Sequence, residues 1–325
     1  MEGSALPKLR VVEKPASTPI SKLVDDYLTN CRARGLSFKT IDDAYGRPLK
    51  HVFLPFCERE GISRPDQVNS RVLDRLGAEL REKGGARGEL SPHSIHAYLR
   101  PVNSFLAWAG KEGELGGGLK AATPKLPKKQ LVVLEREEIQ AMEDSAKTER
   151  DKLIVRVLGD TGMRLDELLT MRVGSVLEQT GVQGRYYIRV KGKGAKERDV
   201  PIMPTLFRRL QRYIAKGRPS GADSDRLWIA MRRSRNGTLE PLASSGVQQM
   251  IRFTAREAGI TKRTHPHLMR HSYATWALRR GMNPIQLADI LGHNSLTMIQ
   301  EVYAHLTPVD AYDAQARIFE EELRG

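Results

Sequence analysis

The chain has 325 residues, of which 40% are hydrophobic and 28% charged, a balance typical of a folded globular protein rather than a disordered one. Lys and Arg outnumber Asp and Glu by 53 to 39, and the resulting net charge of +14 favours a polyanionic partner such as nucleic acid. The sequence shows no apolar run long enough to span a membrane, no signal-peptide pattern, and two cysteines that match no metal-ligand spacing. We therefore expect a nucleic-acid-binding protein of the reducing cytoplasm.

The first part of the chain predicts a helical bundle. Residues 1–18 carry scattered charges and prolines without periodicity, which predicts a flexible tail. Over 19–113, apolar residues recur at helical spacing, so we predict a compact bundle of about four or five helices. Ser91-Pro92 is a typical helix start because a hydroxyl caps free N–H groups and proline fits the first turn. Pro101, within the apolar stripe that follows, is expected to kink this helix.

A basic segment at 114–133 separates the two halves of the chain. Its three consecutive glycines, two prolines and four lysines cannot form a hydrophobic core, so we predict a linker between two domains. Its charge is compatible with a path along a DNA backbone and also with a plain solvated tether.

The second part predicts a mixed, mainly helical domain. Glycine turns separate β-forming residues over 174–202, which predicts a small antiparallel sheet. Apolar periodicity predicts helices on both sides of this sheet. Their expected ranges are 137–145, 151–158, 204–215, 244–258, 267–280, 284–291 and 296–305, followed by an amphipathic C-terminal stretch from 308 to 323.

Two segments of this second part carry isolated cations in distinctive settings. In TGMRLDEL, Glu167 follows Arg164 by three residues, a spacing that on a helix lets the carboxylate orient the guanidinium. In KGKGAKERDVPI, glycines flank Lys193 on a predicted turn between two strands. Taken singly, the first is a typical surface ion pair and the second a typical solvated hairpin tip.

The segment HPHLMRHSYAT begins a predicted helix. His267 and Arg270 lie in its first turn, where free N–H groups favour an anion. The alternative is a metal site formed by His267 and His271, although no Glu follows the first histidine as in the zinc-protease motif. An arginine in the same turn would repel a divalent cation.

The segment LGHNSLTMIQEVYAHL contains His293 and, ten residues later, Tyr303. With the segments before it, the order becomes Arg, Lys, His-x-x-Arg, His, Tyr, which combines a cationic pocket for a phosphodiester with a phenol nucleophile. This order and these motifs resemble the catalytic signature of the tyrosine recombinase, or phage integrase, family in its Xer-like form, over the whole chain in outline. One departure is that Xer-type sequences usually place the last histidine and the tyrosine one residue closer.

The resemblance implies a two-domain fold. It implies an all-α N-terminal core-binding bundle, SAM-like, at 19–113 and a mixed α+β tyrosine-recombinase catalytic domain with a small antiparallel sheet at 134–307. Residues 308–325 would then form a C-terminal helix. In this family such a helix docks on a neighbouring protomer or packs on its own domain, and both arrangements stay open here.

The resemblance also implies a site in which each matched residue serves the transfer of a phosphodiester to a phenol. The implied roles are phosphate clamping by Arg164, pocket support by Glu167, leaving-group protonation by Lys193, proton transfer by His267, phosphate clamping by Arg270, phosphate hydrogen bonding by His293 and nucleophilic attack by Tyr303.

This chemistry suits the residue types. Arginine forks neutralise phosphate oxygens through charge-assisted hydrogen bonds, so we expect no metal, no other cofactor and no ATP. A phenol has a pKa of about 10 and needs a proton acceptor during attack. The resemblance implies a 3′-phosphotyrosine intermediate, double-stranded recombination sites at the nucleoid, and a homotetramer that joins two duplexes through a four-way junction. A second recombinase or accessory protein is compatible with it, and no membrane partner is expected.

Two other functions fit part of the pattern. A non-catalytic DNA-binding protein of the same fold would explain the charge and the helices. A type IB topoisomerase-like relaxase would use the same Arg-Lys-Arg-His-Tyr chemistry. The Xer-like segments HPHLMRH and LGHNS favour recombination over both.

Overall fold

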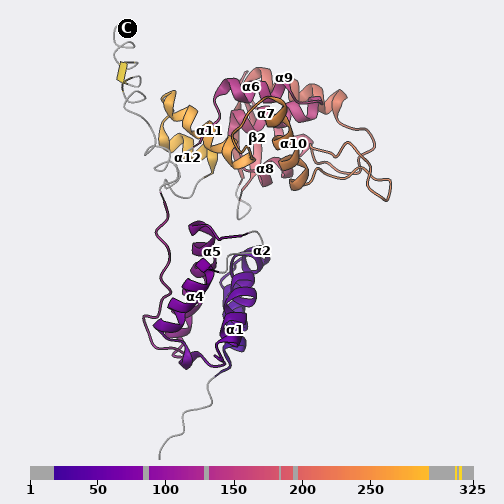
Figure 1. The fold of residues 1–325 in the computed structure, drawn as a ribbon. Coiled ribbons are helices and arrows are strands. Elements are labelled where there is room, and N and C mark those ends of the chain that lie inside the picture. The colour runs from indigo at the N-terminus through magenta and orange to yellow at the C-terminus, as the bar shows by residue number, and fades with distance from the viewer. Residues whose placement is uncertain are drawn as a thin grey trace, which may run out of the picture. The chain divides into compact units, whose positions relative to one another are not determined.

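The computed structural model describes residues 18–82, 88–127, 132–182, 184–192 and 197–292, together with Tyr312, Gln315 and Ala316. The chain divides into two compact units, Met1–Lys129 and Gln130–Gly325 (Figure 1). Each unit has its own hydrophobic core. Among the described helices, none is long and apolar enough to cross a membrane. The domain boundaries that the sequence predicts, with domains at 19–113 and 134–307, stay predictions.

Unit 1 consists of helices in the part that the structure describes. They are α1 (Ile20–Ala33), α2 (Phe38–Thr40), the π-helical turns η1 (Ile41–Gly46) and η2 (Leu49–Phe53), α3 (Leu54–Arg59), the 3-10 turn η3 (Pro65–Gln67), α4 (Ser70–Glu82) and α5 (Pro92–Lys111). The predicted start of α5 is confirmed, since the Ser91 hydroxyl accepts a hydrogen bond from the Ser94 amide. The helix continues through Pro101.

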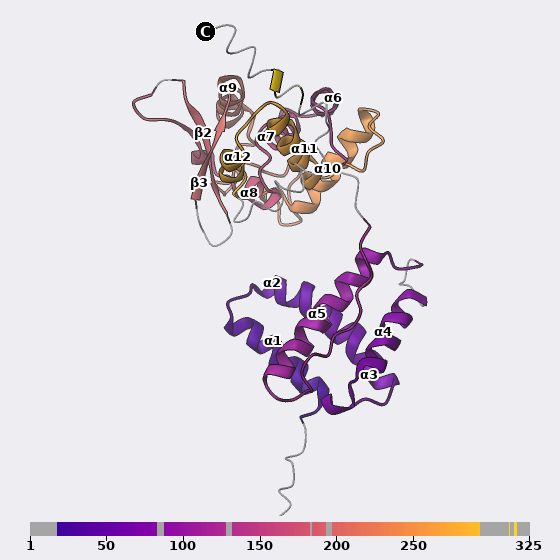
Figure 2. The same cartoon turned by 90° about the vertical axis from the view of Figure 1, so that its left-hand side faces the viewer.

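An aromatic group joins α1 to α5 in the core of unit 1. The Tyr27 ring lies 5.8 Å from the Phe105 ring and 5.4 Å from the Trp108 ring, between centroids. Its hydroxyl donates to Ser104 Oγ at 2.7 Å. Helices α1, α4 and α5 can be followed in Figure 2. Tyr27 thus buries its apolar ring while its polar end has a partner.

Unit 2 is mainly helical with one small sheet. Its elements are α6 (Arg136–Asp144), α7 (Glu149–Thr161), α8 (Leu165–Thr170), the 3-10 turn η4 (Val173–Ser175), β1 (Val176–Glu178), β2 (Tyr186–Lys191), β3 (Glu197–Ile202), α9 (Pro204–Arg212), the π-helical turn η6 (Tyr213–Gly217), α10 (Ser244–Glu257), α11 (Pro266–Arg279) and α12 (Pro284–Leu291). The predicted helices up to residue 291 and the predicted sheet are confirmed. The predicted helix 296–305 lies outside the described residues, as does all of 308–325 except Tyr312, Gln315 and Ala316.

The three strands are antiparallel in the order β1-β2-β3. Val190 pairs with Arg198 across β2 and β3, and Arg189 pairs with Asp199. Side chains alternate between the two faces of a strand, and Val190, Val200 and Ile202 are buried. Arg198 is in phase with the two buried residues of β3, so it lies on the inner face of the sheet. Figure 2 shows β2 and β3 at the edge of unit 2, with α12 beside β3.

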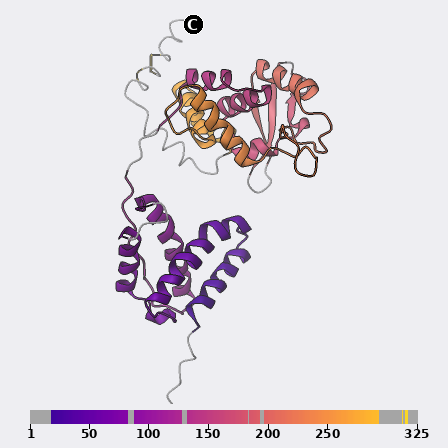
Figure 3. The same cartoon turned by 45° about the vertical axis from the view of Figure 1, so that its right-hand side comes forward.

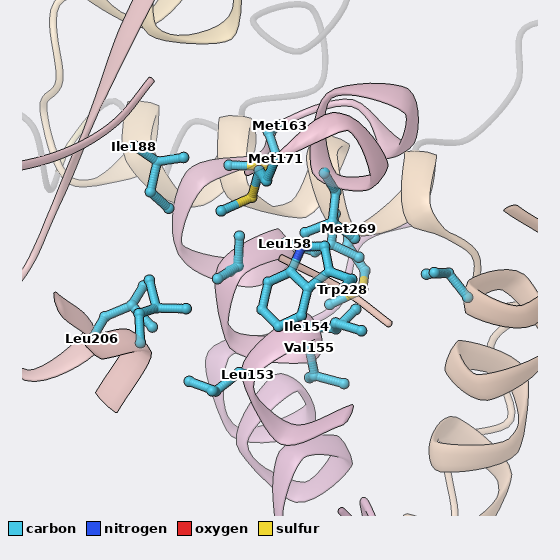
Figure 4. Packing of buried hydrophobic residues seen from close by; sticks show 14 of the residues in the cluster. Leu153, Ile154, Val155, Leu158, Met163, Met171, Ile188, Leu206, Trp228 and Met269 are labelled. Atoms are coloured by element: carbon cyan, nitrogen blue, oxygen red, sulfur yellow. The ribbon is translucent and has the colours of Figure 1, made fainter. Parts of the chain in front are cut away.

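Helix α7 runs through the centre of the core of unit 2. Figure 4 shows Ile154 and Leu158 of α7 close to Trp228 and to Met269 of α11. Helices α11 and α12 pack against each other, and Figure 3 shows them in orange and yellow at one side of the unit. This packing fixes the ends of α7, α11 and α12 relative to one another, and the candidate site lies at these ends.

Candidate active site

Two glycines in the left-handed conformation end α7 and α12. Gly162 has φ 58° and Gly292 has φ 65°. A Cβ atom on Gly162 would lie 2.6 Å from Tyr273 Cδ1 and 2.9 Å from Leu291 Cδ2, and one on Gly292 would lie 2.7 Å from Arg198 Nη1. Both turns therefore need glycine for backbone conformation and for space.

Arg270 lies on α11 and is 4% exposed. Its Nη1 donates to the Gly162 carbonyl at 2.7 Å, and its Nη2 donates to the Leu291 carbonyl at 2.8 Å. Burial, followed by the nearby charge of Arg164, lowers the pKa of Arg270 to about 9. An anion at this position would favour the charged guanidinium.

Arg164 and Glu167 form an ion pair at the start of α8. Glu167 Oε1 accepts from Arg164 Nη1 at 2.9 Å, and Oε2 accepts from the Arg164 main-chain N–H at 2.8 Å. Arg164 precedes the helix as its N-cap, so the contact arises from helix capping. The predicted contact between the Glu167 carboxylate and the Arg164 guanidinium, three residues apart, is present, although Arg164 lies at the N-cap and not inside the helix. Arg164 also donates from Nη2 to the Gly292 carbonyl at 2.9 Å and from Nη1 to the Leu291 carbonyl at 3.3 Å.

Arg198 of β3 also binds Glu167, and sequence reasoning missed it. Its Nη1 and Nη2 donate to Oε1 and Oε2 of Glu167, each at 2.8 Å, and its Nε donates to the Ile290 carbonyl at 2.8 Å. The strand pattern contained the signal, since an arginine in phase with Val200 and Ile202 must point inward and needs a buried partner.

Glu167 is 3% exposed and stays charged because of its partners. Burial by itself would raise the pKa of Glu167. The hydrogen bonds from Arg198 and Arg164 outweigh burial and hold that pKa below its ordinary value.

The three arginines meet at the C-terminal end of α12. Their donors reach the carbonyls of Ile290, Leu291 and Gly292, which have no partner within the helix and lie at the negative end of its dipole. This end brings together segments from TGMRLDEL, KGKGAKERDVPI, HPHLMRHSYAT and LGHNS. Arg164, Arg198 and Arg270 together carry three positive charges, and Glu167 supplies one negative charge.

Of the four other predicted site residues, the structure describes His267 alone. His267 is exposed on the first turn of α11. Lys193, His293 and Tyr303 lie outside the described residues. Lys193 falls in sequence between the described ends of β2 and β3, and His293 directly follows Gly292. The catalytic roles of all seven residues stay predictions.

The described ranges contain no group of three or more His, Cys, Asp or Glu side chains arranged to hold a metal ion. His267 is exposed and His271 is half-buried. Within this part of the chain, no third side chain of these types is placed to bind a metal ion together with His267 and His271.

Residues 132–309, more than half of the chain, match the phage integrase family. The tyrosine recombinase XerD of Listeria innocua is 27% identical over 309 residues, which cover 90% of this chain and 97% of that protein. The XerH site-specific recombinase bound to a palindromic difH substrate, in a post-cleavage complex, has a TM-score of 0.67 at 20% identity, covering 92% of this chain and 85% of that chain. A lambda integrase tetramer bound to a Holliday junction has a TM-score of 0.63 at 17% identity, covering 88% and 80%. The last two share the fold, and this chain belongs to the phage integrase family as a Xer-like tyrosine recombinase.

Proposed function

We propose that this site-specific recombinase cleaves and rejoins DNA through a covalent bond between Tyr303 and a 3′ phosphate. The convergence of Arg164 and Arg270 at the end of α12 supports this proposal most directly. Phosphoryl transfer builds negative charge on the phosphate oxygens, and fixed cationic donors stabilise that charge. Each well-placed donor contributes about 3–4 kcal/mol to the transition state, by analogy with oxyanion-hole deletions.

The other predicted residues complete the reaction. Tyr303 attacks the phosphorus while His267 assists removal of the phenolic proton, and Lys193 gives a proton to the departing 5′ oxygen. His293 hydrogen-bonds the phosphate and Glu167 supports the pocket. The 5′ hydroxyl of a partner strand then attacks the phosphotyrosine bond, which restores the DNA and releases the tyrosine.

The two domains have distinct parts in this scheme. Residues 19–113 act as a SAM-like core-binding domain on DNA at the nucleoid, 134–307 act as the catalytic domain, and 114–133 link them. The solved lambda integrase tetramer on a Holliday junction supports a homotetramer on two duplexes as the working assembly. The XerH–difH complex supports a double-stranded recombination site as the substrate. The alternatives of a topoisomerase-like relaxase and of a non-catalytic DNA-binding protein are not favoured, because the relatives are recombinases.

The C-terminal segment 308–325 contributes to assembly by docking on a neighbouring protomer. Ending the chain after Thr307 should weaken tetramer formation on DNA and spare binding of a single site. Unchanged recombination by the shortened chain would place this segment on its own domain instead.

The decisive experiment traps the covalent intermediate. A nicked suicide substrate loses the strand needed for religation, so wild-type protein should accumulate an SDS-resistant adduct with it. Tyr303→Phe should bind the same DNA and form no adduct, whereas Tyr312→Phe, which changes an exposed tyrosine of the C-terminal segment, should behave as wild type. An adduct that survives in Tyr303→Phe would exclude Tyr303 as the nucleophile.

Lys193 has its own test. Lys193→Ala should cleave slowly, and a 5′-thio leaving group, which needs no protonation, should restore the rate. Absence of that rescue would remove Lys193 as the general acid.

A further inference from the structure

The two arginines that bind Glu167 bind it unequally. Arg198 presents a two-pronged fork to both carboxylate oxygens, with both donor–acceptor distances 2.8 Å. Arg164 gives Glu167 a single side-chain hydrogen bond, from Nη1, and directs Nη2 to the Gly292 carbonyl. The Arg198 side chain is 15% exposed and the Arg164 side chain 36%. Arg198 is thus the inner partner of the carboxylate, and Arg164 is the more open one.

We propose that Arg198 is a positioning residue which neutralises Glu167 and so leaves the charge of Arg164 available to the DNA phosphate. This inference rests on the proposed function of the site, in which Arg164 clamps the scissile phosphate. Arg198 itself need not touch DNA for this purpose.

The reasoning begins with the buried carboxylate. A charged group that is 3% exposed needs a partner of opposite charge, because burial without one is costly. Fork-to-carboxylate pairing is the strongest such contact, and Arg198 supplies it. If Arg198 were absent, Arg164 would remain as the carboxylate's arginine partner. Its charge would then be offset by Glu167 and would act less on a phosphate.

The main-chain contacts of Arg198 define a competing explanation. Its Nε binds the Ile290 carbonyl, and its guanidinium lies so close to Gly292 that a Cβ there would be 2.7 Å from Nη1. Through these contacts alone, Arg198 would only hold the end of α12 in place. The two explanations differ in one respect, because only neutralisation depends on the negative charge of Glu167.

The test is a double-mutant cycle of Arg198→Met, Glu167→Gln and the double variant. Each is measured in the full-length chain for single-turnover cleavage of the nicked substrate, for affinity for the same DNA, and for melting temperature. Methionine fills much of the arginine volume without charge, and glutamine keeps the shape of glutamate. Replacement of both members of a buried ion pair by neutral residues is often tolerated, so the double variant should fold.

The expected result is a strongly non-additive cycle. Arg198→Met should cleave at least about tenfold more slowly than wild type, whereas the double variant should cleave within about threefold of Glu167→Gln alone. With the carboxylate charge gone, Arg198 has nothing left to neutralise, so its loss should then matter little.

A matched control is available on the same two strands. Arg189 and Asp199 also form a fork-to-carboxylate pair, at 2.8 and 2.9 Å, but on the exposed face of the sheet. Arg189→Met should leave cleavage unchanged. This variant shows how the loss of a fork-to-carboxylate pair from the same sheet affects cleavage when Glu167 is not involved.

Two outcomes would overturn the inference. They are an Arg198→Met variant that cleaves like wild type, and a double variant more than about tenfold slower than Glu167→Gln. The last comparison decides the matter even if Arg198→Met fails to fold. If wild-type protein forms no covalent adduct, the proposed function fails, whereas a normal wild-type adduct with an additive cycle rejects only the role of Arg198.

Discussion

Among the described residues of unit 2, two buried glutamates each bind two arginines, and the two groups differ in what surrounds them. Glu143, on α6, is 4% exposed and accepts from Arg156 Nε and from Arg209 Nη1, both at 2.5 Å. Glu167 is equally buried and binds Arg164 and Arg198. The residue types and the burial are thus the same.

The charge balance is not the same. Around Glu143, Arg209 also binds Glu149 at 3.0 Å, and the Arg156 guanidinium lies 3.8 Å from a carboxylate oxygen of Asp160. Each of these two arginines therefore has a second carboxylate nearby. Around Glu167, the arginines donate their other hydrogen bonds to main-chain carbonyls, and Arg270 adds another positive charge. A group with equal positive and negative charge can hold helices together, whereas a group with excess positive charge can bind an anion.

The pKa shifts of two arginines reflect this difference. Burial would lower the pKa of Arg209, but its contacts with Glu143 and Glu149 raise it above the ordinary value. For Arg270, burial and the adjacent Arg164 both lower the pKa, to about 9. Contacts with two carboxylates thus outweigh the effect of burial on the pKa of Arg209, whereas for Arg270 the charge of Glu167 raises the pKa by less than burial and Arg164 lower it.

The largest expected effect belongs to Arg270. Arg270→Ala should reduce the single-turnover cleavage rate by about 10²–10³-fold, since it removes a fixed donor to the developing charge. The melting temperature should fall only as far as the lost hydrogen bonds to the Gly162 and Leu291 carbonyls require, and the variant should stay folded at the assay temperature. Cleavage and thermal unfolding of the same samples would check this. If the unfolded fraction alone accounted for the loss of rate, Arg270 would have a structural role like that of Arg209.

Gly162→Ala tests the main-chain side of the same group. The left-handed φ costs about 1–2 kcal/mol for a residue with a Cβ, and the contact with Tyr273 adds the cost of overpacking, about 1–3 kcal/mol. We expect lower unfolding free energy and slower cleavage, because the Gly162 carbonyl holds Arg270. Gly259→Ala is the control, since Gly259 has φ 73° and open space around a Cβ. Equal losses in both variants, measured by chemical denaturation, would show that the close approach to Tyr273 is unimportant.

Arg209→Ala should have the opposite profile from Arg270→Ala. Loss of one partner of the buried Glu143 should lower the unfolding free energy by about 1–3 kcal/mol. The cleavage rate of the folded fraction should stay unchanged, because this group lies outside the proposed catalytic set. Urea titrations alongside cleavage assays would measure both quantities. A specific loss of cleavage would contradict the division into structural and anion-binding groups.

The smallest effect is the acid dependence of Glu167. Its folded pKa lies below the ordinary value of 4.5, so its contribution to stability is complete above that pH and is lost as pH falls through the folded pKa. The stability difference between wild type and Glu167→Gln should therefore shrink as the solution is acidified below pH 4.5. Chemical denaturation at several acidic pH values would measure it. A difference that grows on acidification would mean that burial outweighs the arginine contacts.

Several elements of the fold could be predicted because their signals are local. Periodicity placed α7, α10, α11 and α12 within a few residues of their observed bounds. Turn glycines between β-forming residues predicted the sheet, and the Ser91-Pro92 pair predicted the start of α5. Each of these signals acts over a few neighbouring residues, which a single sequence displays directly.

The assembly of the candidate site could be predicted only in part. The motifs singled out Arg164, Glu167 and Arg270, and the structure places these three side chains around one helix end. It also adds Arg198, whose carboxylate partner lies 31 positions away in the sequence. The acceptors at this end are largely main-chain carbonyls, and every residue has one, so no residue type in the sequence marks them.

The arginines hold α12 by its backbone, and this has a consequence for how the enzyme can diverge or be redesigned. Substitutions of exposed α12 side chains such as Ile285 leave the carbonyls of Ile290, Leu291 and Gly292 in place. The outer surface of this helix is therefore free to acquire new contacts, while the chain that leads into His293 keeps its anchorage.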